Sequence, residues 1–146
     1  MNLRERVYVA LGSNMGDRDG YLAKAREALA KLPLTTVLAE SKVEETEPMG
    51  PVPQGKFLNQ MILVETGLDP GRFLKLLHKI EDENGRERTV RWGPRTLDLD
   101  IVRYGTRRLR DPDLRIPHPE LPNRDWWQRE MEEVDAMAPK KVEKDD

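Results

Sequence analysis

The stretch Arg91-Trp92-Gly93-Pro94-Arg95-Thr96-Leu97-Asp98-Leu99-Asp100-Ile101 says most about the fold and the chemistry of this chain. Its second half alternates between apolar and polar residues, which predicts a β-strand with one apolar face and one polar face. The apolar face would carry Leu97, Leu99 and Ile101. The polar face would carry Thr96, Asp98 and Asp100. Two carboxylates so close on one face cost energy unless something positive lies beside them.

Asp98 and Asp100 therefore suggest a metal site. Mg²⁺ takes carboxylate oxygens and keeps coordination positions for the phosphates of a substrate. Arg91 and Arg95 lie just upstream, where guanidinium groups can bind phosphate oxygens in a bidentate manner. The alternative is the solvent-facing side of an edge strand, but Asp is disfavoured in strands and two in alternation are worse. The pattern favours phosphoryl chemistry on a nucleotide.

The composition indicates one soluble domain. The chain has 146 residues, of which 37% are hydrophobic and 36% are charged, and it contains no cysteine. We expect a single domain over residues 1–139 and a frayed tail over residues 140–146. The N-terminus lacks the apolar core of a signal peptide, and no apolar run reaches membrane-spanning length. We therefore expect a cytoplasmic protein, and a monomer rather than an oligomer.

The charge is distributed unevenly along the chain. The net charge of −2 argues against a general binder of nucleic acid or of anionic membranes. Ten arginines nevertheless lie between Arg86 and Arg124, against six acidic residues. This basic stretch suits a local anionic ligand, although a well-solvated surface explains most single arginines equally well.

The hydrophobic pattern predicts an α+β fold. Strands are expected at residues 7–11, 35–46, 57–66 and 96–102, and helices at residues 17–32, 70–84 and 125–137. Asp69 is the expected N-cap of the second helix, with Pro70 in its first turn. A short strand is expected near Arg108, and residues 111–124 are punctuated by prolines. The order βαββαβ is that of a ferredoxin-like sandwich, a largely antiparallel sheet with helices packed on one side and extra C-terminal elements.

Residues 92–101 also carry a family resemblance. This ten-residue run resembles, without a gap, the signature of the 6-hydroxymethyl-7,8-dihydropterin pyrophosphokinases of the folate pathway. Other stretches agree in order and extend the resemblance over roughly residues 7–126. They are Ala10-Leu11-Gly12-Ser13-Asn14, residues 46–50, Gln54, Phe57-Leu58-Asn59, Ile80-Glu81, Gly85-Arg86, Arg88, Pro117-His118-Pro119 and Asn123-Arg124.

The resemblance implies an ATP-dependent transfer of pyrophosphate to the hydroxymethyl group of 6-hydroxymethyl-7,8-dihydropterin, with release of AMP. It implies Mg²⁺, as two ions, on Asp98 and Asp100. The implied catalytic residues are Arg86, Arg88, Arg95, Asp98 and Asp100. The implied ATP-binding residues are His78, Glu81, Arg88, Trp92, Arg95, Ile101, His118 and Arg124. The implied pterin-binding residues are Thr46, Glu47, Met49, Phe57, Asn59, Asp98 and Trp126.

Some of these positions have an ordinary structural explanation as well. His78 and Glu81 share a helix face by their spacing, and spacing alone favours an exposed polar edge. Trp126 stands where Phe is usual in the family, so a ring face for stacking is kept but the fit of the pocket changes. The glycine-containing motif at residues 10–14 lacks the P-loop pattern, and a structural role is expected for it.

The loop at residues 85–94 is expected to be mobile and to close over ATP, as the resemblance implies for Arg86 and Arg88. A non-catalytic alternative is a ferredoxin-like module that binds RNA through the basic stretch. Such modules expose aromatic residues on their strands, and here only Phe57 fits. We therefore expect small-molecule substrates, no nucleic acid and no membrane.

Overall fold

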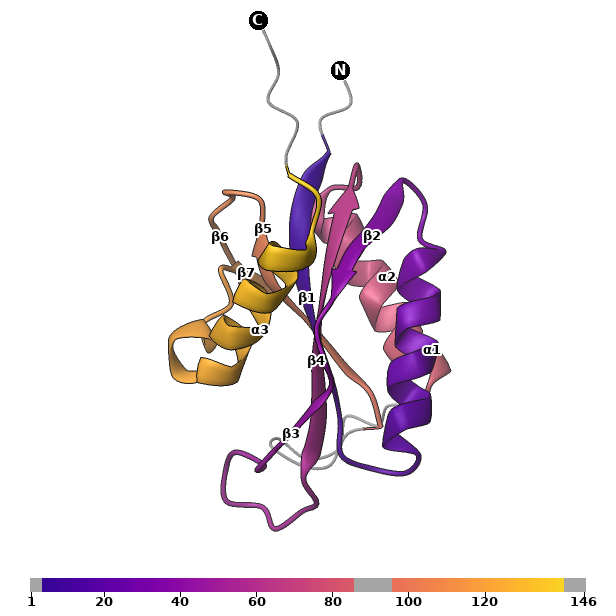
Figure 1. The fold of residues 1–146 in the computed structure, drawn as a ribbon, viewed down its shortest axis with the longest axis vertical. Helices are drawn as coiled ribbons and strands as arrows, with labels where there is room; N and C mark the ends of the chain where they lie inside the picture. The colour runs from indigo at the N-terminus through magenta and orange to yellow at the C-terminus, as the bar shows by residue number, and fades with distance from the viewer. Residues whose placement is uncertain (1–3, 86–95, 141–146) are drawn as a thin grey trace, which may run out of the picture.

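The computed structural model describes residues 4–85 and 96–140. Its main sheet has five strands, all paired antiparallel, in the order β2-β4-β1-β5, with β3 also paired to β4 (Figure 1). The strands are β1 (Glu5–Ser13), β2 (Thr35–Glu40), β3 (Glu44–Thr46), β4 (Phe57–Thr66) and β5 (Asp98–Tyr104). With the helices between them, this order confirms the predicted ferredoxin-like α+β arrangement.

Helices cover both faces of the sheet. The helices α1 (Arg18–Ala30) and α2 (Pro70–Glu83) lie on one face, and α3 (Asp125–Met137) lies on the other (Figure 1). The first face holds the larger apolar core, which includes Val9, Leu29 and Phe73, each with an exposed fraction of 0%. The prediction of helices on one side is therefore correct for α1 and α2, and α3 adds a second covered face. No helix in the described part of the chain is long and apolar enough to span a membrane.

The first two helices begin at the caps that the sequence provides. The Asp17 carboxylate accepts a hydrogen bond from the Gly20 N–H, and the Asp69 carboxylate accepts one from the Arg72 N–H. Each cap satisfies a backbone donor that has no partner within the helix. The second helix ends at Asn84, and Gly85 follows with a φ of +74°, a conformation that glycine adopts without strain.

The predicted strand over residues 35–46 is wrong as a single element. It is divided into β2 and β3, and residues 41–43 belong to neither strand. At the break, the Ser41 hydroxyl accepts a hydrogen bond from the Met61 N–H, and the Gln60 amide donates to the Ser41 carbonyl. The Ser41 N–H still donates to the Met61 carbonyl, so main-chain and side-chain bonds are mixed at the break, and the register slips by one residue before β3 begins.

Several other boundaries differ from the predicted ones. The first strand extends beyond residues 7–11 at both ends, and the first helix ends at Ala30, before the predicted residue 32. The fifth strand begins at Asp98 and ends at Tyr104, two residues later at both ends than predicted. The proline-punctuated segment contains a small hairpin of β6 (Leu109–Asp111) and β7 (Leu114–Ile116), followed by a 3₁₀ turn at Leu121–Asn123. The strand β6 agrees with the short strand expected near Arg108, whereas β7 was not predicted, because three residues are too few for alternation to be recognised in the sequence.

The two faces predicted for β5 are confirmed. Leu99 and Ile101 lie in the core under α1 and α2, with exposed fractions of 4% and 3%. Asp98 and Asp100 alternate with them, while Val102 packs in the second cluster, with α3 residues. The paired carboxylates therefore lie on the face of the sheet that α3 covers only in part.

The third helix packs through an apolar stripe that contains one acidic residue. Trp127 and Val134 are buried against the sheet, with exposed fractions of 2% and 0%. Glu130 lies on the same buried side, with an exposed fraction of 1%. Burial and, next, the neighbouring carboxyl group of Glu44 raise the pKa of Glu130 to about 9. A carboxyl group in such surroundings is held in its neutral form near pH 7.

This burial predicts a stability that falls as the pH rises. Unfolding returns Glu130 to its ordinary pKa of 4.5, against about 9 in the folded chain. Between these values the folded state binds the extra proton, so the free energy of unfolding decreases by up to about 1.4 kcal/mol per pH unit. Below this window the contribution of the neutral carboxyl group is fully present, and above it the loss is complete.

The Glu130→Gln variant removes the titrating proton and keeps the side-chain shape. Urea unfolding at several pH values gives the free energy of unfolding of each chain. Relative to the parent, the variant should become more stable as the pH rises from about 4.5 to about 9, and the difference between the two should be constant outside that window. Glu132→Gln, at an exposed position of the same helix, is the matched control and should give no such trend. Parallel curves for the parent chain and Glu130→Gln would contradict the assignment.

Candidate active site

One pocket brings together the residues predicted to bind the pterin and the predicted metal ligands. It has a volume of about 340 Å³ and lies on the α3 face of the sheet, at the end where β3 pairs with β4. All seven residues predicted to bind the pterin line it, namely Thr46, Glu47, Met49, Phe57, Asn59, Asp98 and Trp126. Asp100 and Arg124 also line it. Residues from four strands, two connecting segments and the start of α3 thus meet around one cavity.

The floor of the pocket is the central strand. Gly12 pairs with Asn59 on one side and with Asp98 on the other, and Ala10 pairs with Asp100. A Cβ atom at Gly12 would lie 3.5 Å from the Phe57 ring and 3.6 Å from the Asn59 side-chain oxygen. The small residues of β1 therefore leave space between the acidic wall on β5 and the amide and aromatic wall on β4.

A fixed histidine, His118, lies beside the acidic wall, although it is not among the residues that line the pocket. His118 Nε2 lies 3.6 Å from an Asp100 carboxylate oxygen, and His118 Nδ1 accepts a hydrogen bond of 3.0 Å from the Glu120 N–H. With Nδ1 occupied as an acceptor, the neutral ring carries its proton on Nε2, the atom that faces Asp100. The ring of Trp127 meets the imidazole edge-on at a centroid distance of 5.0 Å. These contacts hold a hydrogen-bond donor, the Nε2–H group of His118, beside the carboxylates.

The donor set on this wall suits a hard cation. Asp98 and Asp100 supply carboxylate oxygens from alternate positions of one strand. Within residues 4–85 and 96–140, no group of three or more acidic, histidine or cysteine side chains forms a metal cluster. Mg²⁺ is commonly held by one or two carboxylates and completed by substrate phosphates and water. The residues therefore fit a magnesium ion that arrives with a nucleotide.

The opposite wall has an amide and two aromatic rings. The Asn59 side-chain nitrogen donates a hydrogen bond of 2.6 Å to the Thr46 hydroxyl. This bond fixes the amide, so that its oxygen lies near Gly12 on the pocket floor. Phe57 and Trp126 also line the cavity. A flat heterocycle with hydrogen-bonding edges matches a wall of this kind.

A cation lies where α3 begins. The guanidinium carbon of Arg124 lies 4.4 Å from the centre of the Trp127 ring, and Arg124 lines the pocket. Stacking on a buried ring holds the guanidinium in place at little cost in solvation. The pocket thus combines carboxylates and an arginine, as a site for a magnesium-bound anion requires.

Three residues predicted to contact the nucleotide lie away from this pocket. Glu81 is fully buried and its carboxylate accepts a hydrogen bond of 2.8 Å from the Leu99 N–H, so it ties α2 to β5. His78 is half-buried on α2 and does not line the pocket. The Ile101 side chain is in the core, which leaves its backbone for any ligand. Their contact with ATP stays a prediction.

Four other predicted residues, Arg86, Arg88, Trp92 and Arg95, lie outside the described residues, as does the loop predicted to close over ATP. The pocket also includes residues for which the sequence analysis predicted no contact with a ligand. They are Ala10, Leu11, Gly12, Glu120 and Trp127. The small side chains at alternate positions 10 and 12 were a usable signal, because they mark a strand face with room above it.

This combination of fold and pocket is typical of an enzyme that transfers a phosphoryl-type group from a magnesium-bound nucleotide. Residues 8–136 match the family model described as 7,8-dihydro-6-hydroxymethylpterin-pyrophosphokinase (HPPK). The chain therefore belongs to this family. Its members are diphosphokinases of folate biosynthesis, which makes the chain a transferase of the kinase type. The alternative of an RNA-binding module is not favoured.

Individual relatives agree with the family model. The chain is 44% identical over 115 residues to the 2-amino-4-hydroxy-6-hydroxymethyldihydropteridine pyrophosphokinase of Bacillus subtilis, covering 79% of this chain and 69% of the relative. It is 44% identical over 114 residues to the enzyme of the same name from Pseudomonas aeruginosa, covering 78% and 70%. With the Aquifex aeolicus enzyme the identity is 38% over 129 residues, covering 88% and 79%.

A solved structure shares the fold. The crystal structure of Plasmodium falciparum HPPK-DHPS A437G with pteroate superposes with a TM-score of 0.59 at 14% identity. The similarity covers 82% of this chain and 36% of that chain. At this identity the match supports the arrangement of helices and strands.

Proposed function

We propose that this chain transfers the pyrophosphoryl group of ATP to the hydroxymethyl group of 6-hydroxymethyl-7,8-dihydropterin and releases AMP. One observation carries the proposal: a single pocket contains all seven residues predicted for the pterin, with Asp98 and Asp100 on its wall. Family membership supplies the reaction class, and the pocket supplies room for one flat substrate beside an acidic metal site.

The pterin is proposed to lie between Phe57 and Trp126, over the small residues of β1. The Asn59 amide has its orientation set by Thr46, so its oxygen is ready to accept a hydrogen bond from the edge of the ring system. Glu47 and Met49 complete the rim from the loop that follows β3. The hydroxymethyl group would then point toward β5, where Asp98 lies.

Asp98 and Asp100 are proposed to hold Mg²⁺, as two ions. When bound, the metal would neutralise phosphate charge and orient the phosphates for in-line transfer. The transfer forms a bond between the hydroxymethyl oxygen and the β-phosphorus, and it breaks the bond between that phosphorus and the oxygen of the leaving AMP. The proton of the hydroxymethyl group passes to solvent. His118 would donate a hydrogen bond from Nε2, and Arg124 would add a fixed positive charge.

The described contacts also support a single domain. The third helix, near the end of the chain, packs on β4 and β2, which come from its first half. The sheet itself joins β1 to β5 across most of the sequence. A chain whose ends share one sheet and one covering helix has no internal boundary at which to divide.

The test of the proposed function is a coupled assay of AMP release from Mg-ATP. We expect release to require 6-hydroxymethyl-7,8-dihydropterin and to stop when the metal is chelated. The product should be the pterin diphosphate, identified by its mass. Release of AMP without the pterin, or of ADP with it, would contradict the proposal.

The acidic pair should be essential for turnover but not for folding. Asp98→Asn and Asp100→Asn keep the side-chain shape and each remove one anionic ligand, so turnover should fall at least about 100-fold, equivalent to roughly 3 kcal/mol of transition-state stabilisation. The unfolding temperature should change little. Asp113→Asn, at the exposed turn of the β6–β7 hairpin, is the control and should keep full activity. Normal turnover of either strand variant at ordinary Mg²⁺ would remove the pair from the site.

The pocket floor should limit the size of residue 12. A Cβ atom there makes only ordinary contacts, so Gly12→Ala should fold normally and bind the pterin nearly as well. The additional methyl groups of Gly12→Val extend into the space proposed for the ring, and the KM for the pterin should rise at least about tenfold, since overpacking of a filled site costs about 1–3 kcal/mol. The KM for ATP should change much less. Equal effects of Ala and Val, or none, would contradict the proposed position of the pterin.

A further inference from the structure

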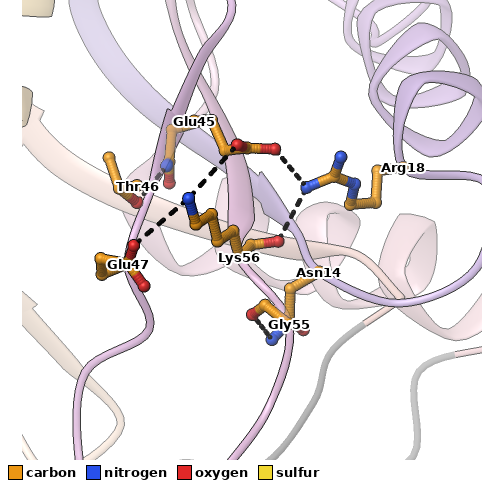
Figure 2. A network of polar contacts seen from close by, with 8 residues as sticks. Asn14, Arg18, Glu45, Thr46, Glu47, Gly55 and Lys56 are labelled. Carbon is orange, nitrogen blue, oxygen red and sulfur yellow. Dashed lines mark hydrogen bonds and ion pairs between the residues drawn. The ribbon is translucent and has the colours of Figure 1, made fainter.

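Arg18, in the first turn of α1, contacts both ends of the loop at residues 47–56 between β3 and β4 (Figure 2). Its Nη1 atom donates to a Glu45 carboxylate oxygen at 3.0 Å and to the Lys56 carbonyl oxygen at 2.9 Å. Glu45 comes two residues before the loop, and Lys56 is its last residue. One guanidinium group therefore connects the two ends of a loop that has no regular structure of its own.

These contacts lie one residue away from the pocket. Glu45 precedes Thr46, and Lys56 precedes Phe57. Thr46 and Phe57 are register partners in the β3–β4 pair, and both line the pocket. Because side chains alternate along a strand, Glu45 points to the α1 face while Thr46 points to the pocket face. The arginine thus acts on the pocket wall from the opposite side of the sheet.

Further contacts hold the same segment. The Lys56 ammonium group lies 3.4 Å from the Glu47 carboxylate and 4.0 Å from that of Glu45 (Figure 2). The Asn14 side-chain nitrogen donates to the Gly55 carbonyl at 3.0 Å and to the Gln54 side chain at 2.8 Å. The loop is therefore attached to the end of β1 and to the start of α1.

We propose that Arg18 is a positioning residue for the pterin: with Glu45 and the Lys56 carbonyl it forms a latch that holds the rim residues Thr46, Glu47 and Met49 in their binding positions. This inference rests on the proposed function. Holding a rim in place before the ligand arrives lowers the entropy cost of binding. The latch should therefore act on pterin affinity and leave the chemistry at β5 unchanged.

Salt concentration distinguishes this role from a general structural one. The Arg18 and Glu45 side chains are 32% and 45% exposed, so dissolved ions screen their attraction. The pterin carries no net charge near neutral pH, so salt has little direct effect on its binding. If the latch acts as proposed, the KM for the pterin rises with salt in the parent chain. It does not rise in an Arg18 variant, which lacks the ion pair.

The experiment compares Arg18→Gln, Glu45→Gln and the double variant with the parent chain. Lys31→Gln is the matched control, because it removes the same charge and an exposed ion pair with Glu27 at the other end of α1. Steady-state kinetics gives the KM for pterin and for ATP at low and high salt. Amide hydrogen exchange of residues 47–56 gives a readout that does not depend on turnover.

Each single variant should raise the KM for the pterin about three- to fivefold at low salt, the range of a half-exposed ion pair. The double variant should be no worse than the more severe single one, because both remove the same interaction. The kcat and the KM for ATP should stay within about twofold of the parent values. The unfolding temperature should stay within a few degrees of that of the parent. Amides of the loop should exchange faster, and Arg18→Lys should restore most of the affinity.

An unchanged KM for the pterin, additive effects in the double variant, or parallel losses for both substrates would overturn the latch. So would a salt dependence of the pterin KM that persists in Arg18→Gln. If the parent chain itself releases no pterin-dependent AMP, the proposed function fails instead. In that case unchanged hydrogen exchange in the variants would still overturn the latch on its own.

Discussion

The register of β1 between β4 and β5 is the constraint on which the site depends. Gly12 is opposite both Asn59 and Asp98, so the polar groups of the two strands that flank β1 meet over its smallest residue. A slip of one residue would turn Asp98 and Asp100 into the apolar core under α1 and α2. Burying two carboxylates there would cost far more than any gain from the slip. The hydrophobic pattern of the sheet therefore also fixes the position of the acidic pair.

The partial cover of the second face turns this polar strip into a pocket. The third helix begins beside the strip and packs Trp127 against His118 and Arg124, so the apolar contact that anchors the helix also orients two polar groups of the site. Further along the helix, Val134 closes the second core. A helix that covered the whole face would fill the cavity, and one that was absent would expose it. Function here depends on where the helix begins.

The sequence was informative wherever local chemistry decides structure. The alternation at residues 97–101 predicted both faces of β5, and Asp69 with Pro70 predicted where the second helix begins. It was uninformative where contacts come from far along the chain. The break after β2 depends on the Ser41 hydroxyl meeting the Met61 N–H, and the buried position of Glu81 depends on the Leu99 N–H. The pterin-binding residues were predicted from the family resemblance. The position of Gly12 at the pocket floor became visible only from the register of β1 with β4 and β5.

The short strand β3 shows how such distant contacts decide the site. A strand of three residues forms few ladder bonds, so side-chain contacts also contribute to its position. Its first residue, Glu44, binds Arg129 of α3 at 2.8 Å on the pocket face. The next residue, Glu45, binds Arg18 of α1 on the opposite face. Helices on opposite faces of the sheet therefore hold adjacent residues, and the third residue, Thr46, receives its position from both. Because Thr46 in turn fixes the Asn59 amide, the orientation of the pocket's main hydrogen-bonding group depends on two surface ion pairs that do not touch the cavity.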